Sequence, residues 1–184
     1  MVHRVSKECH QYDTSRIELE KGNKNMLSEE TLIAVAIATW KSNLERANKL
    51  FGGLDESALE KQVAPGRNRL VYLWGHLAST HDRMLQLLGI AERVHPELDA
   101  VFLSSPDGAS TLPPIDVMRE WWAQVNQRLD AGLRELTLNN WVARHTAVSE
   151  EDFANEPLRN RFSILITRTN HLAYHVGQAT LAAK

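Results

Sequence analysis

Four segments of this chain carry apolar side chains at the three- and four-residue spacing of a buried helix face, and this pattern constrains the fold more than any other feature. Each segment is about 21 to 26 residues long, and none alternates polar and apolar residues as a strand does. No internal repeat is visible. Helices of this length bury their apolar faces against one another. The pattern therefore predicts an all-α protein built as a four-helix bundle.

The expected helices begin and end at recognisable signals. The hydroxyl of Ser28 caps the first, Gly52-Gly53 ends it, and Pro114 opens the third. The four helices are expected at about residues 28–51, 68–88, 114–136 and 157–183. Residues 90–113 form a long crossover connection, of a length that often shapes the mouth of a site, and residues 137–156 form a second linker.

Residues 1–27 differ from the rest of the chain. They are polar and mixed in charge, without sustained periodicity, so we predict an appended N-terminal tail there. The remaining residues, 28–184, are predicted to form one domain, because 184 residues and 20.8 kDa are typical of a single core.

Composition excludes several classes of function. A formal charge of −2 and a pI near 6.4 argue against a nucleic-acid binder, which would show a basic face. Cys9 is the single cysteine, which excludes an internal disulfide and a thiolate metal cage. The longest apolar run, Leu32 to Trp40, is about half of what a membrane span requires, and no signal-peptide core precedes it. We expect a cytoplasmic protein without membrane partners.

The last helical run, Asn160 to Ala183, carries the most specific chemical signal. His171 and His175 stand four residues apart and Gln178 follows three residues later, so all three share one helix face. Two neutral imidazoles one turn apart can bind the same divalent ion. Leu172 stands where a zinc-protease helix has its glutamate, which excludes that class.

The second helix carries two further histidines. His81 falls near the middle of the apolar face and His76 at its edge, about 140° away at 100° per residue. One straight helix therefore cannot easily direct both to one ion. We expect His81 to be a core residue, and His76 taken alone has the same interpretation. His145, in the second linker, is a weaker candidate for the mouth of a site.

These residues resemble a known family. The runs Gly-His-Leu-Ala at 75–78 and Asn-His-Leu-Ala-Tyr-His-Val-Gly-Gln at 170–178 look like the DinB-like (YfiT-type) metalloenzymes. The resemblance covers residues 28–183. It implies a bundle that holds a divalent metal with three histidines, often as a homodimer. Carried over by position, the ligands are His76, His171 and His175.

The resemblance and the donor types together suggest the chemistry. Three imidazoles leave a fourth position for water, as in catalytic zinc sites, and nitrogen donors favour Zn, Ni or Fe. Gln178 is expected to hydrogen-bond a ligand imidazole or the bound water. Ring nitrogens more than about 6 Å apart would exclude a shared ion, since two ligands at about 2.0–2.1 Å span roughly 4 Å.

Two functions from different classes follow. Some relatives are thiol-dependent S-transferases or isomerases, so the favoured expectation is a metal-dependent thiol S-transferase or hydrolase. The metal would lower the pKa of a bound water or low-molecular-weight thiol, and a small-molecule substrate would bind in a pocket beneath the Ala91–Pro113 crossover. No carboxylate is evident as a general base, which favours transfer and also supports the alternative, a non-catalytic metal- or ligand-binding bundle. Trp121 and Trp122 are expected to pack in the core or at a dimer interface. The resemblance and the spare aromatic surface at these two residues lead us to expect a homodimer.

Overall fold

A computed structural model describes residues 28–183, and every named element within them is a helix. The predicted tail at residues 1–27, including Cys9, lies outside the described residues. The long helices are α1 (Glu29–Gly52), α3 (Leu70–Leu87), α5 (Ile115–Glu135) and α8 (Arg161–Ala182), and the short ones are α2 (Glu56–Leu59), α4 (Leu98–Phe102), α6 (Leu138–Val142) and α7 (Glu150–Asn155). The prediction of an all-α four-helix bundle is confirmed.

Two helix starts follow from side-chain caps. The hydroxyl of Ser28 accepts a hydrogen bond from the backbone N–H of Thr31 at 3.3 Å, so α1 begins where the sequence predicts. The last helix begins at Arg161 and not at Pro157, because the side chain of Asn160 caps it. The expected start of α8 was therefore four residues too early.

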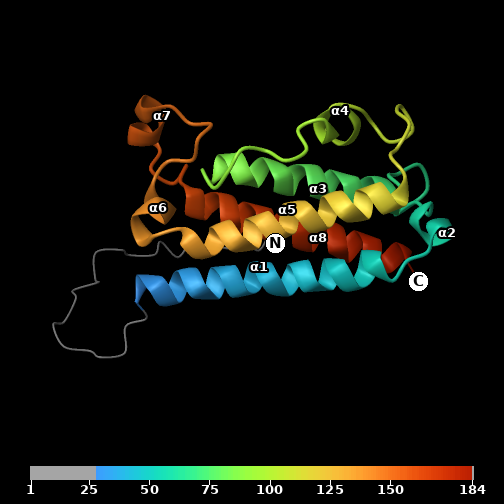
Figure 1. Ribbon diagram of the computed structural model, residues 1–184, viewed down its shortest axis with the longest axis horizontal. Helices are drawn as coiled ribbons and strands as arrows, with labels where there is room; N and C mark the ends of the chain where they lie inside the picture. Colours follow the sequence, from blue (N-terminus) through green and yellow to red (C-terminus); the bar gives the residue numbers. More distant parts are fainter. Residues whose placement is uncertain (1–27, 184) are drawn as a thin grey trace, which may run out of the picture.

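The direction of the long helices positions the candidate site. In Figure 1, α1 and α8 run one way along the bundle while α3 and α5 run the other way, because the long crossover returns the chain to the same end. The helix α8 packs against both α1 and α3, and α3 also packs against α5. Since α3 and α8 are antiparallel neighbours, the first half of α3 faces the second half of α8.

All four long helices contribute to the buried interior. Trp40, Leu77, Leu129 and Leu172 come one from each of them, and all are at most 1% exposed. Within residues 28–183, no helix combines the length and apolar character needed to cross a membrane.

The two long connections are more ordered than the sequence predicts. The crossover contains α4, whose Leu98 and Phe102 are fully buried against the bundle. The second linker contains α6 and α7, and Trp141 of α6 is buried in the same way. Burial of these apolar side chains stabilises α4 and α6, which are too short to persist alone.

Candidate metal centre

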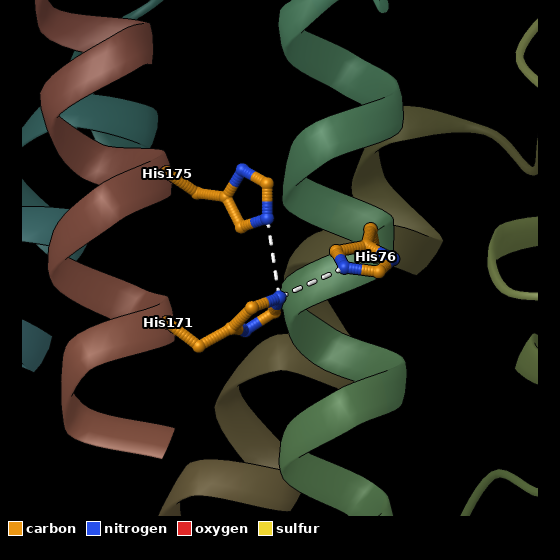
Figure 2. A group of neighbouring side chains, drawn as sticks. All are labelled: His76, His171 and His175. Carbon is orange, nitrogen blue, oxygen red and sulfur yellow. Dashed lines mark hydrogen bonds between the residues drawn. The ribbon is translucent and has the colours of Figure 1, made fainter. Parts of the chain in front are cut away.

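Three histidine side chains meet between α3 and α8 (Figure 2). The Nε2 atoms of His76 and His175 each lie 3.1 Å from Nε2 of His171. One ligand atom from each ring lies within 4.8 Å of the others. Two imidazoles bound tetrahedrally to one ion at about 2.0–2.1 Å would be roughly 3.3 Å apart. The rings are therefore close enough to share an ion.

A glycine beside His76 lets the crossover contribute to this site. A Cβ atom at Gly75 would overlap the ring of Phe102, so only glycine allows α4 to lie this close to α3. The close approach brings the backbone oxygen of Phe102 within 3.0 Å of His76 Nδ1. Gly75, the glycine of the Gly-His-Leu motif, is therefore needed for this packing.

Hydrogen bonds fix the tautomers of two rings. His76 Nδ1 donates to the Phe102 carbonyl, and His175 Nδ1 donates to Gln178 Oε1 at 2.8 Å. In the neutral form each of these rings then carries its free lone pair on Nε2, the nitrogen that faces the centre. This is the arrangement in which metal-binding histidines are held by their outer partners.

His171 is poorly satisfied by the protein alone. Its Nε2 faces the lone pairs of both His76 and His175, and a neutral ring has one hydrogen to offer. Its Nδ1 is buried without a hydrogen-bond partner among residues 28–183. A cation at the centre would instead accept a lone pair from each ring. The donor set therefore fits a metal ion.

Burial keeps the three rings neutral. Burial, as the largest cause, together with the neighbouring His175 and His76 lowers the pKa of His171 to about 4. Burial is also the main cause of the lowered pKa of His76 and His175. Arg168, one turn before His171, adds a positive charge that lowers the pKa of His76 and His171. At neutral pH all three imidazoles are free of the protons that would compete with a metal.

The group holds imidazoles alone. Within the described part of the chain, no aspartate or glutamate joins the cluster of His76, His171 and His175. Three nitrogen donors leave at least one coordination position open, which is the feature that separates catalytic from structural zinc sites.

Comparison with known proteins identifies the family. The sequence matches the DinB superfamily over residues 39–179. The chain belongs to the DinB superfamily. A solved structure, the conserved protein of locus from Enterococcus faecalis, covers 83% of this chain and 95% of its own, with a TM-score of 0.59 and 14% identity, which supports the fold alone. No curated protein matches this chain.

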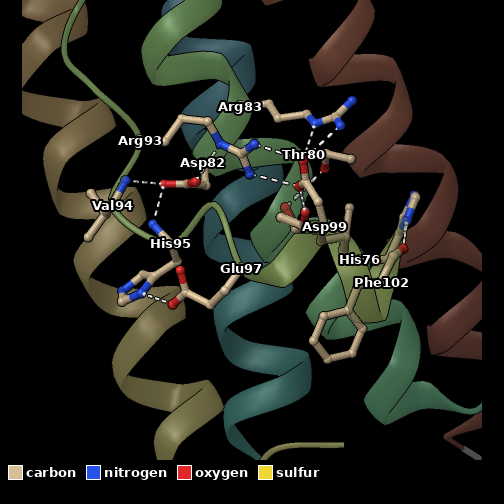
Figure 3. A network of polar contacts seen from close by, with 12 residues as sticks. His76, Thr80, Asp82, Arg83, Arg93, Val94, His95, Glu97, Asp99 and Phe102 are labelled. Atoms are coloured by element: carbon tan, nitrogen blue, oxygen red, sulfur yellow. Dashed lines mark hydrogen bonds and ion pairs between the residues drawn. The ribbon is translucent and has the colours of Figure 1, made fainter. Parts of the chain in front are cut away.

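A charged network holds the crossover of this DinB-superfamily protein in place (Figure 3). Asp99 of α4 accepts hydrogen bonds from Arg83 of α3 and from Arg93 at 2.7 Å each. Arg93 also pairs with the fully buried Asp82 of α3 at 2.9 Å. Both carboxylates are satisfied on several sides, so α4 is fixed on α3 and the Phe102 carbonyl is fixed over His76. No sequence pattern predicts this network, because its residues come together only in the fold.

Gln178 lies where the sequence analysis expected it, beside a candidate ligand. Its Oε1 accepts from His175, and its Nε2 donates to the Tyr174 hydroxyl at 3.0 Å. The amide therefore links Tyr174 to His175 and helps to orient the imidazole.

Two other histidines lie outside the cluster. His81 is 1% exposed, donates from Nδ1 to Asn126 Oδ1 at 2.8 Å, and packs between Trp40 and Trp122, so it is the core residue that the sequence predicts. Burial lowers the pKa of His81 to about 3. His145 lies in the linker between α6 and α7 and does not join the three rings.

Of the two interpretations of Trp121 and Trp122, core packing is correct and spare aromatic surface is wrong. Trp122 is buried, with its indole N–H donating to Asn48 at 2.7 Å, and Trp121 packs partly buried against the core beside His95. These two tryptophans are not spare surface, because α5 turns them towards the bundle and the crossover. The homodimer remains a prediction that rests on the family resemblance.

The pocket at the site also differs from the expectation. A surface pocket borders His175 and Gln178, but its other wall is the turn at residues 63–68 and not the Ala91–Pro113 crossover. The crossover is packed tightly on α3, where Phe102 is fully buried.

Proposed function

We propose that His76, His171 and His175 bind one divalent metal ion, and that the protein is a metal-dependent enzyme acting on a small molecule, as a thiol S-transferase or a hydrolase. The observation that supports this most is the convergence of three Nε2 atoms whose outer nitrogens are hydrogen-bonded in two of the three rings. A donor set of imidazoles favours Zn, Ni or Fe over Mg or Ca.

A bound ion would supply Lewis acidity that lowers the pKa of a water or thiol at the open position. The protein's own part is to hold the rings neutral and oriented and to keep positive charge nearby. Nε of Arg168 is buried without a hydrogen-bond partner among the described residues, and this cation favours an anionic nucleophile or substrate. A free thiol, with a pKa near 8.5, needs less help from a base than water does. The lack of a carboxylate in the cluster therefore favours transfer from a thiol.

The first experiment is elemental analysis of protein expressed without an affinity tag, before and after reconstitution with Zn or Ni. We expect about one equivalent of metal in the wild type and in a His145→Ala control, which removes a histidine outside the cluster. His171→Ala should lose most of it. Metal-free wild-type protein after reconstitution would exclude the proposal.

A second candidate function is a non-catalytic metal- or ligand-binding bundle, which the absence of a carboxylate base from the cluster also favours. Low-molecular-weight thiols assayed against electrophilic acceptors separate the two. Turnover that disappears together with metal in His171→Ala supports the enzyme. Stoichiometric metal without turnover for any pair supports the binder.

A further inference from the structure

The pocket beside the three histidines has the size and lining of a small-molecule site. It has a volume of about 610 Å³ and lies between α8 and the turn at residues 63–68. Figure 1 shows the connection that leads into α3 at the same end of the bundle as the end of α8. The ring of His175 forms part of its wall. Volumes of roughly 300–1,000 Å³ are usual for ligand pockets.

One part of the pocket wall is apolar. Val63, Ala64, Leu73 and Leu181 line it. Leu181 is 74% exposed and Tyr174, also in the lining, is 63% exposed, although both side chains are largely apolar. Exposed apolar side chains that gather at one concave surface indicate that an apolar group binds there.

The opposite wall is a preformed turn. The N–H of Arg67 donates to the Ala64 carbonyl at 3.0 Å, with Pro65 and then Gly66 between them, and Gly66 has a φ of 71°. Proline followed by a glycine with positive φ is the pattern of a type II turn. Arg69, at the end of this segment, is held by Asp107 at 2.6 Å. The backbone of Arg67 is therefore placed before any ligand arrives.

Arg67 gives the pocket its charge. Among the described residues that line it, Arg67 alone is charged at neutral pH. None of the ion pairs within residues 28–183 includes Arg67. The neighbouring pocket at Arg69 differs, because Glu56, Glu60 and Asp116 line it as well. A cation without a neighbouring carboxylate, in a pocket with a partly apolar wall, favours an anionic ligand.

The Tyr174 hydroxyl adds a neutral donor. Its oxygen accepts from Gln178 Nε2, because Gln178 Oε1 is committed to His175 Nδ1–H. The hydroxyl hydrogen of Tyr174 is then free to donate to a ligand.

We propose that this pocket binds the substrate, and that the substrate is a small molecule with an apolar body and a carboxylate that pairs with Arg67. The proposal rests on the proposed function, since it places the reacting end of that molecule at the His175 wall. It adds a substrate class and a specificity-determining residue that lies outside the candidate ligands.

The test uses two thiols that differ in one group, 6-mercaptohexanoate and 6-mercaptohexanol. Their dissociation constants are measured by backbone-amide NMR titration of the zinc-loaded wild type, of Arg67→Ala, and of Arg128→Ala. Arg128 is a matched control because it is an exposed arginine that lines a different pocket, on α5. Zinc content is measured for each protein.

We expect the wild type and Arg128→Ala to bind the carboxylate about fivefold more tightly than the alcohol, the upper range for an exposed ion pair. Arg67→Ala should bind both thiols alike, with unchanged zinc content. The proposal would be overturned if Arg67→Ala preferred the carboxylate as strongly as the wild type does. It would also be overturned if the wild type showed no preference for the carboxylate over the alcohol.

Hexanoate and hexanol on metal-free protein separate this inference from the function on which it rests. If hexanoate still binds more tightly than hexanol, while neither zinc nor the thiol group increases the affinity, the pocket is supported and the thiol chemistry is refuted. Thiol affinity that depends on zinc but not on the carboxylate supports the function and refutes the role of Arg67.

Discussion

The affinity of the three-histidine site for zinc should resist acidification far better than a site made of ordinary imidazoles. The perturbation is a change from pH 7 to pH 5. A histidine with the usual pKa of about 6.5 is about three-quarters neutral at pH 7 and about 3% neutral at pH 5. Because a ligand must lose its proton to bind, one such histidine lowers the affinity about 25-fold, and three lower it about 10⁴-fold.

The structure predicts a much smaller loss. With the pKa of His171 at about 4, that ring remains about nine-tenths neutral at pH 5 and contributes a factor of about 1.1. Burial lowers the pKa of His76 and His175 in the same direction. If His76 and His175 titrated at the ordinary pKa of about 6.5, the loss would be about 700-fold, so the affinity should fall by less than about 700-fold.

Isothermal titration calorimetry of metal-free, untagged protein with zinc at both pH values measures the ratio. His145→Ala is the control for histidines outside the site. A loss approaching 10⁴-fold would refute the reasoning, because it would mean that the three rings titrate as if exposed to water.

Three further predictions concern residues around the site. Gln178→Leu should weaken zinc binding about 10- to 100-fold in a chelator-competition assay, because His175 Nδ1–H loses its acceptor. Gln178→Glu, which keeps an acceptor, should bind zinc within a few-fold of the wild type. Equal zinc affinities of Gln178→Leu and the wild type would contradict this. The pKa of His81 is about 3 in the folded protein and about 6.5 in the unfolded chain. Between pH 7 and pH 5 only the unfolded chain gains this proton, so the free energy of unfolding of the metal-free protein should fall by about 2 kcal/mol through His81. Urea unfolding of His81→Gln should show a pH loss smaller by that amount, and equal losses would refute it. Gly75→Ala should lower the free energy of unfolding, measured in urea, by about 1–3 kcal/mol and should weaken zinc binding, because the added methyl group displaces Phe102. A wild-type unfolding free energy together with a wild-type zinc affinity would show that α4 moves freely.

The sequence alone determined the features that depend only on residues close together along the chain. Helical periodicity gave the four long helices, and the side chain of Ser28 gave the start of α1. The pairing of His171 with His175 has the same origin, since residues four apart on a helix share a face in any fold. The start at Pro157 was wrong because the competing cap, Asn160, lies three residues later and fits equally well by sequence.

Only the tertiary structure determined the contacts between residues that are far apart in the sequence. His76 is 95 residues from His171, and helical spacing along α3 does not tell which of its histidines faces α8; the sequence pointed to His76 only through the family motif. That choice depends on α3 running antiparallel to α8, which follows from the long crossover between α3 and α5. The acceptor for His76 is a backbone oxygen of Phe102, which carries no sequence signal, and the turn that carries Arg67 meets α8 only in the folded chain. The sequence alone determined the helices and one pair of imidazoles, because those depend on spacing along one element; the third imidazole and the pocket depend on how separate elements pack.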